Sequence, residues 1–202
     1  MSAKRGTFWI NLGLLLVAAA LFLVGYNLRT AKQAERTAEA VISQMCQALP
    51  TAPGESSPPT LPEYLKDPNR EMPVQTIDGR DYIGVLSIPA LELELPILSG
   101  CTYPNLKVAP CRYLGSAYND SLVIAAHNYS THFGRLSTLQ DGDSVLFTDM
   151  EGTVFSYEVV ALETLMPTAV EEMATGDWDL TLFTCTLGGQ SRVTVRCARI
   201  EP

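Results

Sequence analysis

An uncharged run from Gly6 to Leu28 constrains the fold of this chain more than any other feature. At about 1.5 Å per residue, a helix of these 23 residues reaches roughly 34 Å, which is enough to cross a bilayer. Trp9 and Tyr26 lie near its ends, where amphipathic rings favour the membrane interface. Apolar residues continue past Ala18–Ala20, so we expect an uncleaved anchor rather than a signal peptide cleaved there.

Composition divides the chain into four segments. Residues 1–28 are predicted to be the membrane anchor, and residues 29–49, which are rich in helix formers, a helical stalk. Residues 50–81 open with five prolines in thirteen positions and are predicted to be an extended spacer. Residues 82–202 are predicted to form one globular domain.

The net charge of 14 − 22 = −8 belongs wholly to this last segment. Residues 82–202 carry six basic and fourteen acidic side chains, and an acidic surface repels phosphate backbones, which excludes nucleic acid as a partner. Arg192, Arg196 and Arg199 lie within the last eleven residues, so half of these cations fall on one predicted strand. Alternation places Arg192 and Arg196 on one face and Val193, Val195 and Cys197 on the other, which predicts that Cys197 is a core residue.

From Tyr82 onward, short apolar or alternating runs are separated by turn residues, a pattern typical of a β-rich domain. The predicted strands are Tyr82–Ile88, Leu91–Leu98, Cys111–Leu114, Ser121–His127, Asp143–Asp149, Thr153–Met166, Leu180–Thr186 and Arg192–Ile200. Short helices or turns are expected before the third strand and around residues 133–139 and 169–174. Eight strands in about 120 residues favour a closed barrel or a sandwich, since the spacing is too short for parallel βαβ layers.

Three residues with catalytic potential lie at ends of predicted strands. His127 and Cys185 each follow a buried apolar run, and Arg192 opens the last strand. A side chain at a strand end is held by the sheet yet open to solvent. A thiolate beside a cation is an activated nucleophile, and an arginine stabilises a developing oxyanion. Judged by position alone, a cysteine in an apolar strand is more often core packing.

The surrounding sequence resembles the sortase family. Thr181-Leu-Phe-Thr-Cys185 followed by Arg192 resembles the TLxTC…R signature of sortases. The stretch 126–136, Ala-His-Asn-Tyr-Ser-Thr-His-Phe-Gly-Arg-Leu, resembles their histidine loop and is nearest to the class B and class D patterns. Residues 83–97, with Ile88-Pro89 and Pro96-Ile97, resemble the first hairpin of the sortase barrel. The resemblance covers residues 82–200.

This resemblance implies a mainly β fold: a closed eight-stranded barrel with short helices, preceded by a transmembrane helix. It makes Cys185 the nucleophile, His127 the catalytic histidine, and Arg192 the residue that holds substrate and oxyanion. Thr184 and Thr186 are the predicted substrate-binding residues. A backbone N–H in the 185–186 region is expected to complete the oxyanion hole.

The implied activity is that of a membrane-anchored cysteine transpeptidase. Such an enzyme cleaves an LPxTG-like sorting signal through an acyl-enzyme on Cys185 and transfers the protein to an amine of the cell wall or a pilin. The expected partners are sorting-signal-bearing surface proteins, the acceptor amine, and the membrane through residues 7–28. The catalytic domain is expected to be extracellular, on a Gram-positive-type cell. Calcium binds to some class A sortases, but no ligand spacing indicates it here, so no cofactor is expected.

Two other classes of function are compatible with the residues alone. A non-sortase cysteine peptidase or amidase would act by hydrolysis, and an anchored binding module would use the same side chains only for packing. His132 is expected on the surface or a groove wall, with no zinc partners around it. Cys101 and Cys111 are expected to be free thiols, with a disulfide as the alternative.

Overall fold

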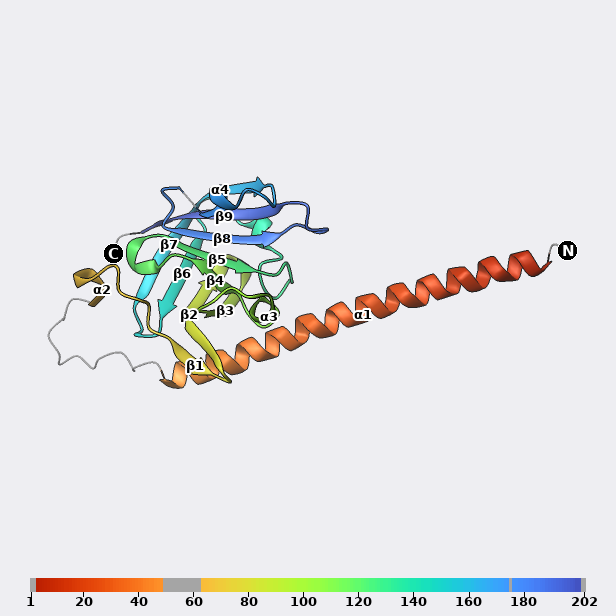
Figure 1. The fold of residues 1–202 in the computed structure, drawn as a ribbon, viewed down its shortest axis with the longest axis horizontal. Helices are drawn as coiled ribbons and strands as arrows, with labels where there is room; N and C mark the ends of the chain where they lie inside the picture. The colour runs from red at the N-terminus through yellow and green to blue at the C-terminus, as the bar shows by residue number, and fades with distance from the viewer. Residues whose placement is uncertain (1–2, 49–62, 175, 201–202) are drawn as a thin grey trace.

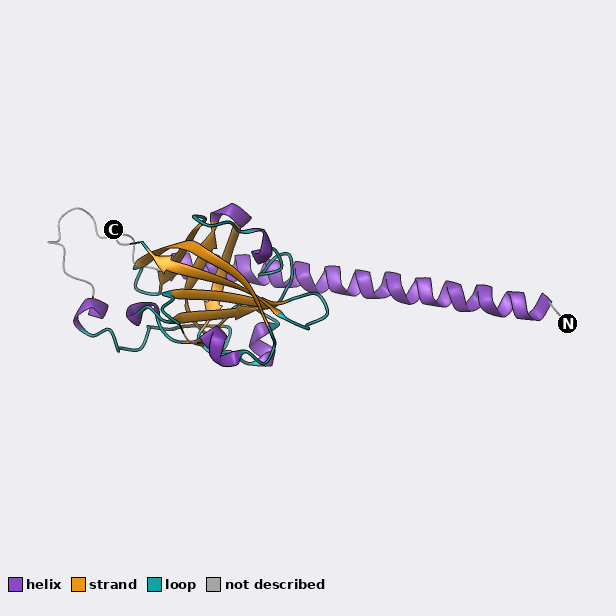
Figure 2. Cartoon of the chain, turned by 90° about the horizontal axis from the view of Figure 1, so that it is seen from above, coloured by secondary structure: helices purple, strands orange, loops and turns teal. Residues whose placement is uncertain are grey.

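The computed structural model of the protein describes residues 3–48, 63–174 and 176–200. It shows a compact β-barrel and one long helix that projects from it (Figures 1 and 2). The strands are β1 (Gln75–Ile77), β2 (Arg80–Ile88), β3 (Leu93–Leu98), β4 (Cys111–Leu114), β5 (Leu122–Ala126), β6 (Ser144–Asp149), β7 (Val154–Leu165), β8 (Leu180–Cys185) and β9 (Arg192–Arg199). The helices are α1 (Ala3–Ala48), α2 (Glu63–Lys66), α3 (Tyr103–Leu106) and α4 (Val170–Ala174), with 3-10 turns η1 (Pro89–Leu91), η2 (Ala117–Asn119) and η3 (Leu136–Thr138).

The sheet closes on itself. Its strand order is β1-β2-β3-β4-β5-β8-β9-β7-β6, and β2 also pairs with β6. Strands β2 to β9 therefore form a closed eight-stranded barrel, to which β1 is added as a ninth strand paired with β2. The predicted barrel is confirmed, and each of the eight predicted strands matches an observed one to within a few residues.

Strand β1 lies in the stretch that the sequence predicts to be spacer. The hairpin to β2 turns at Asp78 and Gly79, whose φ angles of 50° and 73° are both left-handed. An Asp-Gly pair readily adopts such a turn, so Asp78-Gly79 is the sequence signal for this hairpin. The sequence-based prediction misses this signal because residues 63–81 are polar and do not look like strands. The sheet thus begins at Gln75, seven residues before Tyr82, while residues 50–62 of the predicted spacer lie outside the described residues.

The pairing of β5 with β8 is parallel and runs over five residue pairs, from Leu122 opposite Leu180 to Ala126 opposite Thr184. The connection between these strands passes through the antiparallel hairpin of β6 and β7 rather than through a crossover helix. Because the two strands run in the same direction, their carboxyl ends meet at one edge of the barrel.

Alternation divides each strand between the barrel interior and its outer surface. On β9, Val195 and Cys197 are fully buried in the interior core, which confirms the prediction for Cys197. Outside, Phe183 of β8 packs with Val123 and Met173 in a smaller cluster beneath α4. This division follows because successive side chains of a β-strand point to opposite faces of the sheet.

Arg196 faces outward but is only 3% exposed. Its Nε donates to Glu163 Oε2 at 3.0 Å, and its Nη1 donates to Thr181 Oγ1 at 3.1 Å and to the Met173 carbonyl oxygen at 3.3 Å. This buried cation ties α4 to the outer surface of β8 and β9, so its role is structural.

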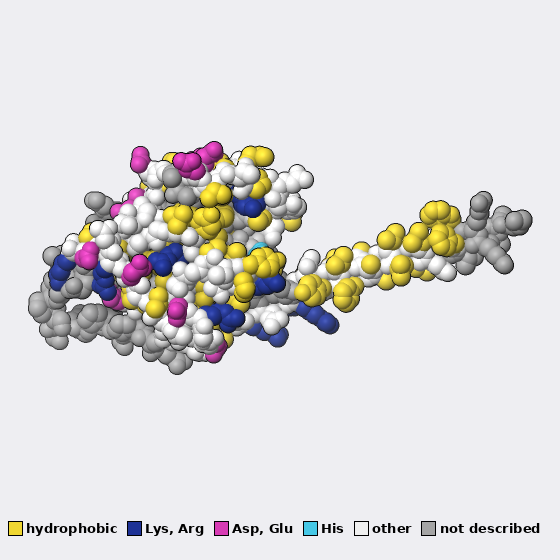
Figure 3. Space-filling model, viewed as in Figure 1, with side chains coloured by type: hydrophobic (Ala, Val, Ile, Leu, Met, Phe, Trp, Pro, Cys, Tyr) yellow, Lys and Arg dark blue, Asp and Glu magenta, His cyan; other side chains and the backbone are white. Residues whose placement is uncertain are grey.

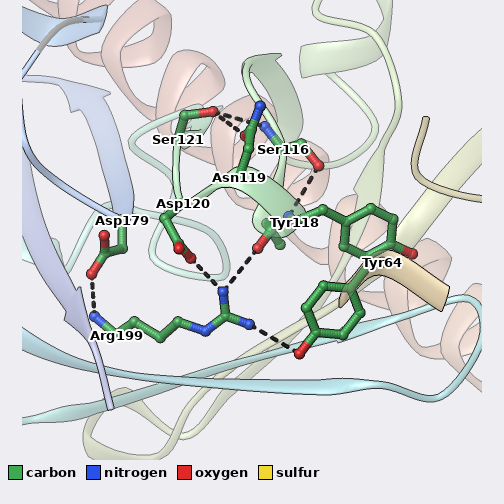
Figure 4. Close-up of polar contacts among 9 residues, drawn as sticks. Tyr64, Ser116, Tyr118, Asn119, Asp120, Ser121, Asp179 and Arg199 are labelled. Carbon is green, nitrogen blue, oxygen red and sulfur yellow. Dashed lines mark hydrogen bonds and ion pairs between the residues drawn. The ribbon is translucent and has the colours of Figure 1, made fainter. Parts of the chain in front are cut away.

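Arg199 holds the opposite end of β9 (Figure 4). Its guanidinium donates to Asp120 and to the Ala117 carbonyl oxygen, and it lies 4.7 Å from the centre of the Phe155 ring. Tyr64 of α2 accepts a further hydrogen bond at 3.5 Å. The contacts join β9 to the segment before the barrel, so of the three clustered arginines only Arg192 is left for the predicted site.

Helix α1 is continuous through the predicted anchor and stalk. Residues Phe8–Arg29 are long and apolar enough to span a membrane, and none of them is buried in the protein. Figure 3 shows apolar side chains along this projecting part of the helix. Val41 and Met45, by contrast, are 3% and 0% exposed, because they pack against Tyr82, Leu98 and other barrel residues. The end of the stalk is therefore docked directly on the barrel.

We expect Arg199→Leu to lower the free energy of unfolding by about 2 kcal/mol, because it removes charged hydrogen bonds from partly buried acceptors. Asp120→Asn should cost less than about 1 kcal/mol, since Asp120 is 44% exposed and solvent screens its charge. Chemical denaturation of both variants measures the difference. Equal losses would mean that the exposed ion pair, rather than the contacts with Phe155 and Ala117, stabilises this corner.

Candidate active site

Three strand ends bring His127, Cys185 and Arg192 together. Cys185 and Arg192 are directly opposite each other in the antiparallel pair of β8 and β9, so their side chains share one face of the sheet. Ala126 pairs with Thr184 on the parallel side, and the next residue on each chain is His127 and Cys185. Since Ala126 and Thr184 face inward, His127 and Cys185 project from the outer surface with Arg192.

Thr184 fastens the two catalytic strands together. Its side chain is 3% exposed, and its Oγ1 donates to the Ala126 carbonyl oxygen at 2.8 Å. The bond joins the residue before Cys185 to the residue before His127, so it fixes the spacing of the strand ends that carry these two residues. The hydroxyl is fully engaged within the protein, and a role of Thr184 in binding substrate stays a prediction.

Thr186 closes the loop between β8 and β9. Its N–H donates to the Ser191 carbonyl oxygen at 2.9 Å, and its Oγ1 accepts a hydrogen bond from the Ser191 N–H at 3.1 Å. Of the backbone N–H groups in the 185–186 region, where an oxyanion-hole donor is predicted, that of Thr186 is thus occupied. Arg192 Nη1 donates to the carbonyl oxygens of Gly189 and Ser191, both at 3.2 Å, which keeps the guanidinium beside this loop.

His127 lies among aromatic rings. The Tyr129 ring centre is 5.0 Å from that of His127, and Tyr103 meets the imidazole edge-on at 6.3 Å. Nε2 of His127 is buried without a hydrogen-bond partner among the described residues. Burial lowers the pKa of His127 below its ordinary 6.5, and the nearby charge of Lys107 lowers it further. The imidazole is therefore neutral at pH 7.

Tyr103 and Lys107 are site residues that the sequence did not reveal. They come from α3 and the turn after it, and the Lys107 ammonium lies 4.7 Å from the Tyr103 ring centre. No motif surrounds them, and they lie twenty or more positions before His127 in the chain. Their proximity to the histidine is a consequence of barrel closure.

His132 is fully buried, in contrast to its predicted place on the surface or a groove wall. The 128–134 turn folds back on itself, with the Phe133 N–H donating to the His127 carbonyl oxygen at 3.2 Å, and this carries His132 inward. Both of its ring nitrogens lack partners among the described residues. Burial lowers the pKa of His132 to about 4, and the charge of His127 adds to the effect.

A cleft of about 370 Å³ opens beside Cys185. The apolar side chains of Phe133, Leu187 and Val193 line it together with the polar Asn128 and Ser137. Hollows of about 460 and 500 Å³ lie elsewhere, between β4 and the segment before β1 and between α1 and β3. The smaller cleft is the one that Cys185 lines, so it is the candidate substrate site.

The cysteines and acidic residues around the barrel are the other candidate reactive groups and metal ligands. Cys101 and Cys111 are free thiols, and their mutual hydrogen bond lowers the pKa of Cys101 and raises that of Cys111. Within residues 3–48, 63–174 and 176–200, no three His, Cys, Asp or Glu side chains gather as a metal site would require.

Comparison with known proteins identifies the family. The Sortase domain model matches residues 86–200, which is more than half of the chain. Sortase A of Bacillus anthracis is 29% identical over an alignment of 119 residues, and the match covers 54% of this chain and 55% of that protein, so the chain spans about half the length of this curated relative.

Solved structures agree with this match. Sortase C1 from Streptococcus suis superimposes with a TM-score of 0.52 at 27% identity, over 60% of this chain and 74% of that one. A Clostridium perfringens sortase C, solved with the C-terminal cell wall sorting motif, shares the fold with a TM-score of 0.54 at 24% identity, over 69% of this chain and 85% of its own. The chain belongs to the sortase family.

The buried His132 predicts how stability changes with pH. Below about pH 6.5 the unfolded chain binds a proton at this histidine, whereas the folded protein does not bind it until about pH 4. The free energy of unfolding should therefore fall by about 3 kcal/mol through this window because of His132. His132→Phe should remove that loss, as seen by urea denaturation at pH 7 and pH 4.5. An unchanged pH dependence in the variant would contradict the burial of a neutral His132.

Proposed function

We propose that the protein is a membrane-anchored cysteine transpeptidase with Cys185 as nucleophile, His127 as acid and base, and Arg192 as the oxyanion-binding residue. The proposal is supported chiefly by the arrangement of these three side chains on one outer edge of a sortase barrel. An imidazole next to a thiol and a guanidinium opposite it are the groups that acyl transfer needs.

The proposed substrate is a protein with an LPxTG-like sorting signal. The C. perfringens sortase C was solved with the C-terminal cell wall sorting motif, and the cleft beside Cys185 in this chain has apolar walls at Phe133 and Val193. These walls fit the apolar side chains of a Leu-Pro pair, which would bring the following Thr carbonyl to the nucleophile. Thr184 and Thr186 then act mainly by keeping the floor of the cleft in place.

Acyl-enzyme formation follows from the neutral state of His127. The imidazole accepts the Cys185 thiol proton as the sulfur attacks the scissile carbonyl carbon. Arg192 leaves the loop carbonyls and donates to the developing oxyanion, which is needed because the Thr186 N–H is already bonded. The C–N bond breaks, the leaving amine takes the proton from the imidazolium, and a thioester remains on Cys185.

Transfer reverses these steps with a different amine. An amino group of a cell-wall precursor or a pilin attacks the thioester carbonyl, and His127 removes its proton. The C–S bond then breaks, and His127 returns the proton to the Cys185 sulfur. Every proton is carried by side chains of the chain itself, so we propose that the reaction needs no metal or cofactor.

The proposed location is the outer surface of a Gram-positive-type membrane. Helix α1, through Phe8–Arg29, would cross the bilayer once and leave residues 63–202 outside the cell. Residues 1–28 serve as anchor and 82–202 as catalytic domain, to which the structure adds β1 and its hairpin.

Replacement of the nucleophile and the arginine tests the proposed roles. Cys185→Ala should abolish cleavage of a fluorogenic LPxTG-type peptide, and Arg192→Ala should lower kcat/KM by roughly 10²–10³-fold. Cys101→Ala is the matched control, because it removes another half-buried free thiol that lies outside the cleft. Near-normal activity of Arg192→Ala would refute the proposed mechanism even if Cys185 proved essential.

The acceptor distinguishes transfer from hydrolysis. We expect that added oligoglycine or a lysine-containing peptide changes the product to the amine adduct and speeds the release of acyl groups from Cys185. Mass spectrometry of the products gives the ratio of adduct to free acid. A mixture that remains entirely hydrolytic across a range of amine acceptors would favour a cysteine peptidase instead.

A further inference from the structure

The orientation of α1 relative to the barrel is set by side-chain packing. Ala38, Val41 and Met45 recur at helical spacing along one face of α1, and all three are buried. Val41 and Met45 pack into a cluster with Ile77 of β1 and Leu98 of β3. A helix docked in this way fixes how the barrel sits relative to the segment that enters the membrane.

The catalytic edge of the barrel lies beside the last turn of the candidate span. Burial raises the pKa of Tyr129, and the neighbouring Tyr103 and Tyr26 hydroxyls raise it further. Tyr26 belongs to the span Phe8–Arg29, whereas the Tyr129 ring centre lies 5.0 Å from that of His127. Ser130 and Thr131 of the same loop also line the hollow of about 500 Å³ beside α1, so the histidine loop lies along the helix that contains the span.

Apolar groups on this edge are left exposed by the described residues around them. Leu187, in the loop between β8 and β9, is 94% exposed, and Tyr103 is 68% exposed. In both Figures 1 and 2, that loop is the part of the barrel that reaches furthest toward the N-terminal half of α1. Lys107 beside Tyr103 adds positive charge to this edge, although residues 82–202 are acidic overall, and Arg29 adds positive charge at the end of the span.

We propose that this edge rests on the bilayer that α1 spans, with Leu187 and Tyr103 in the membrane interface. An aliphatic side chain, an amphipathic ring and a lysine are the combination that favours the interface with anionic headgroups. The proposal rests on the membrane anchor of the proposed function. It means that the cleft beside Cys185 opens at the membrane surface, so that peptide and acceptor approach along the bilayer.

Tryptophan quenching in vesicles tests the contact with the full chain. The two native tryptophans, Trp9 and Trp178, are replaced by Phe, and either Leu187→Trp or Tyr103→Trp is introduced. Ile200→Trp is the matched control, because Ile200 is 42% exposed just beyond the opposite end of β9. The proteins are inserted into phosphatidylcholine–phosphatidylglycerol vesicles whose phosphatidylcholine carries bromine near the headgroup end of its acyl chains. Circular dichroism confirms folding.

We expect a severalfold greater loss of emission for Leu187→Trp and Tyr103→Trp than for Ile200→Trp. Equal, weak quenching at all three positions would overturn the proposal. It would also be overturned if Leu187→Trp responded only to an added sorting-signal peptide, since the loop would then serve the peptide groove.

A chain that keeps Trp9 and carries only Trp178→Phe reports on the anchor separately. Quenching of Trp9 without quenching of Leu187→Trp would refute the membrane contact alone. Absence of Trp9 quenching would refute the anchor itself, and the peptide cleavage assay tests the chemistry independently of both.

Discussion

The parallel pairing of β5 with β8 is the constraint on which the candidate site depends. It brings the ends of two strands that are 58 residues apart to one edge, with the Thr184 hydroxyl on the Ala126 carbonyl oxygen as its last link. The antiparallel pairing of β8 with β9 then adds Arg192 opposite Cys185. The backbone hydrogen bonds of the sheet thus position the Cα atoms of His127, Cys185 and Arg192 at one edge. No loop has to become ordered around a substrate to bring them there.

The alternation of inward and outward side chains along the strands builds the core and also places the candidate site residues on the outer surface. Inward residues such as Leu182 and Val195 fill the barrel, and the outward positions on the same strands divide into two uses. Arg196, beneath α4, is covered and structural, whereas Arg192, beyond the covered part of the strand, stays half-buried beside the loop between β8 and β9. Two arginines four residues apart on one face therefore have different roles, because α4 covers only one of them.

The environment of His127 follows from how the chain packs around the edge. Burial keeps the imidazole neutral, and the Lys107 charge acts in the same direction. A neutral histidine accepts a thiol proton readily and becomes an acid only after it has done so, which suits the role that we propose for His127 in delivering the proton to a leaving amine. His132 is buried in the turn that follows, with no hydrogen-bond partner for its ring nitrogens among the described residues, so its burial lowers the stability of the fold in acid.

The sequence by itself determined the apolar span, the eight strands of the barrel, and the strand-end residues His127, Cys185 and Arg192. Hydropathy and the alternation of apolar residues in strands are local properties, so they can be read directly along the sequence. It did not reveal β1, the burial of His132, the structural roles of Arg196 and Arg199, or the approach of Tyr103 and Lys107 to His127. These depend on contacts between segments distant in the chain, and only closure of the barrel and docking of α1 decided which surfaces are covered and which face the site.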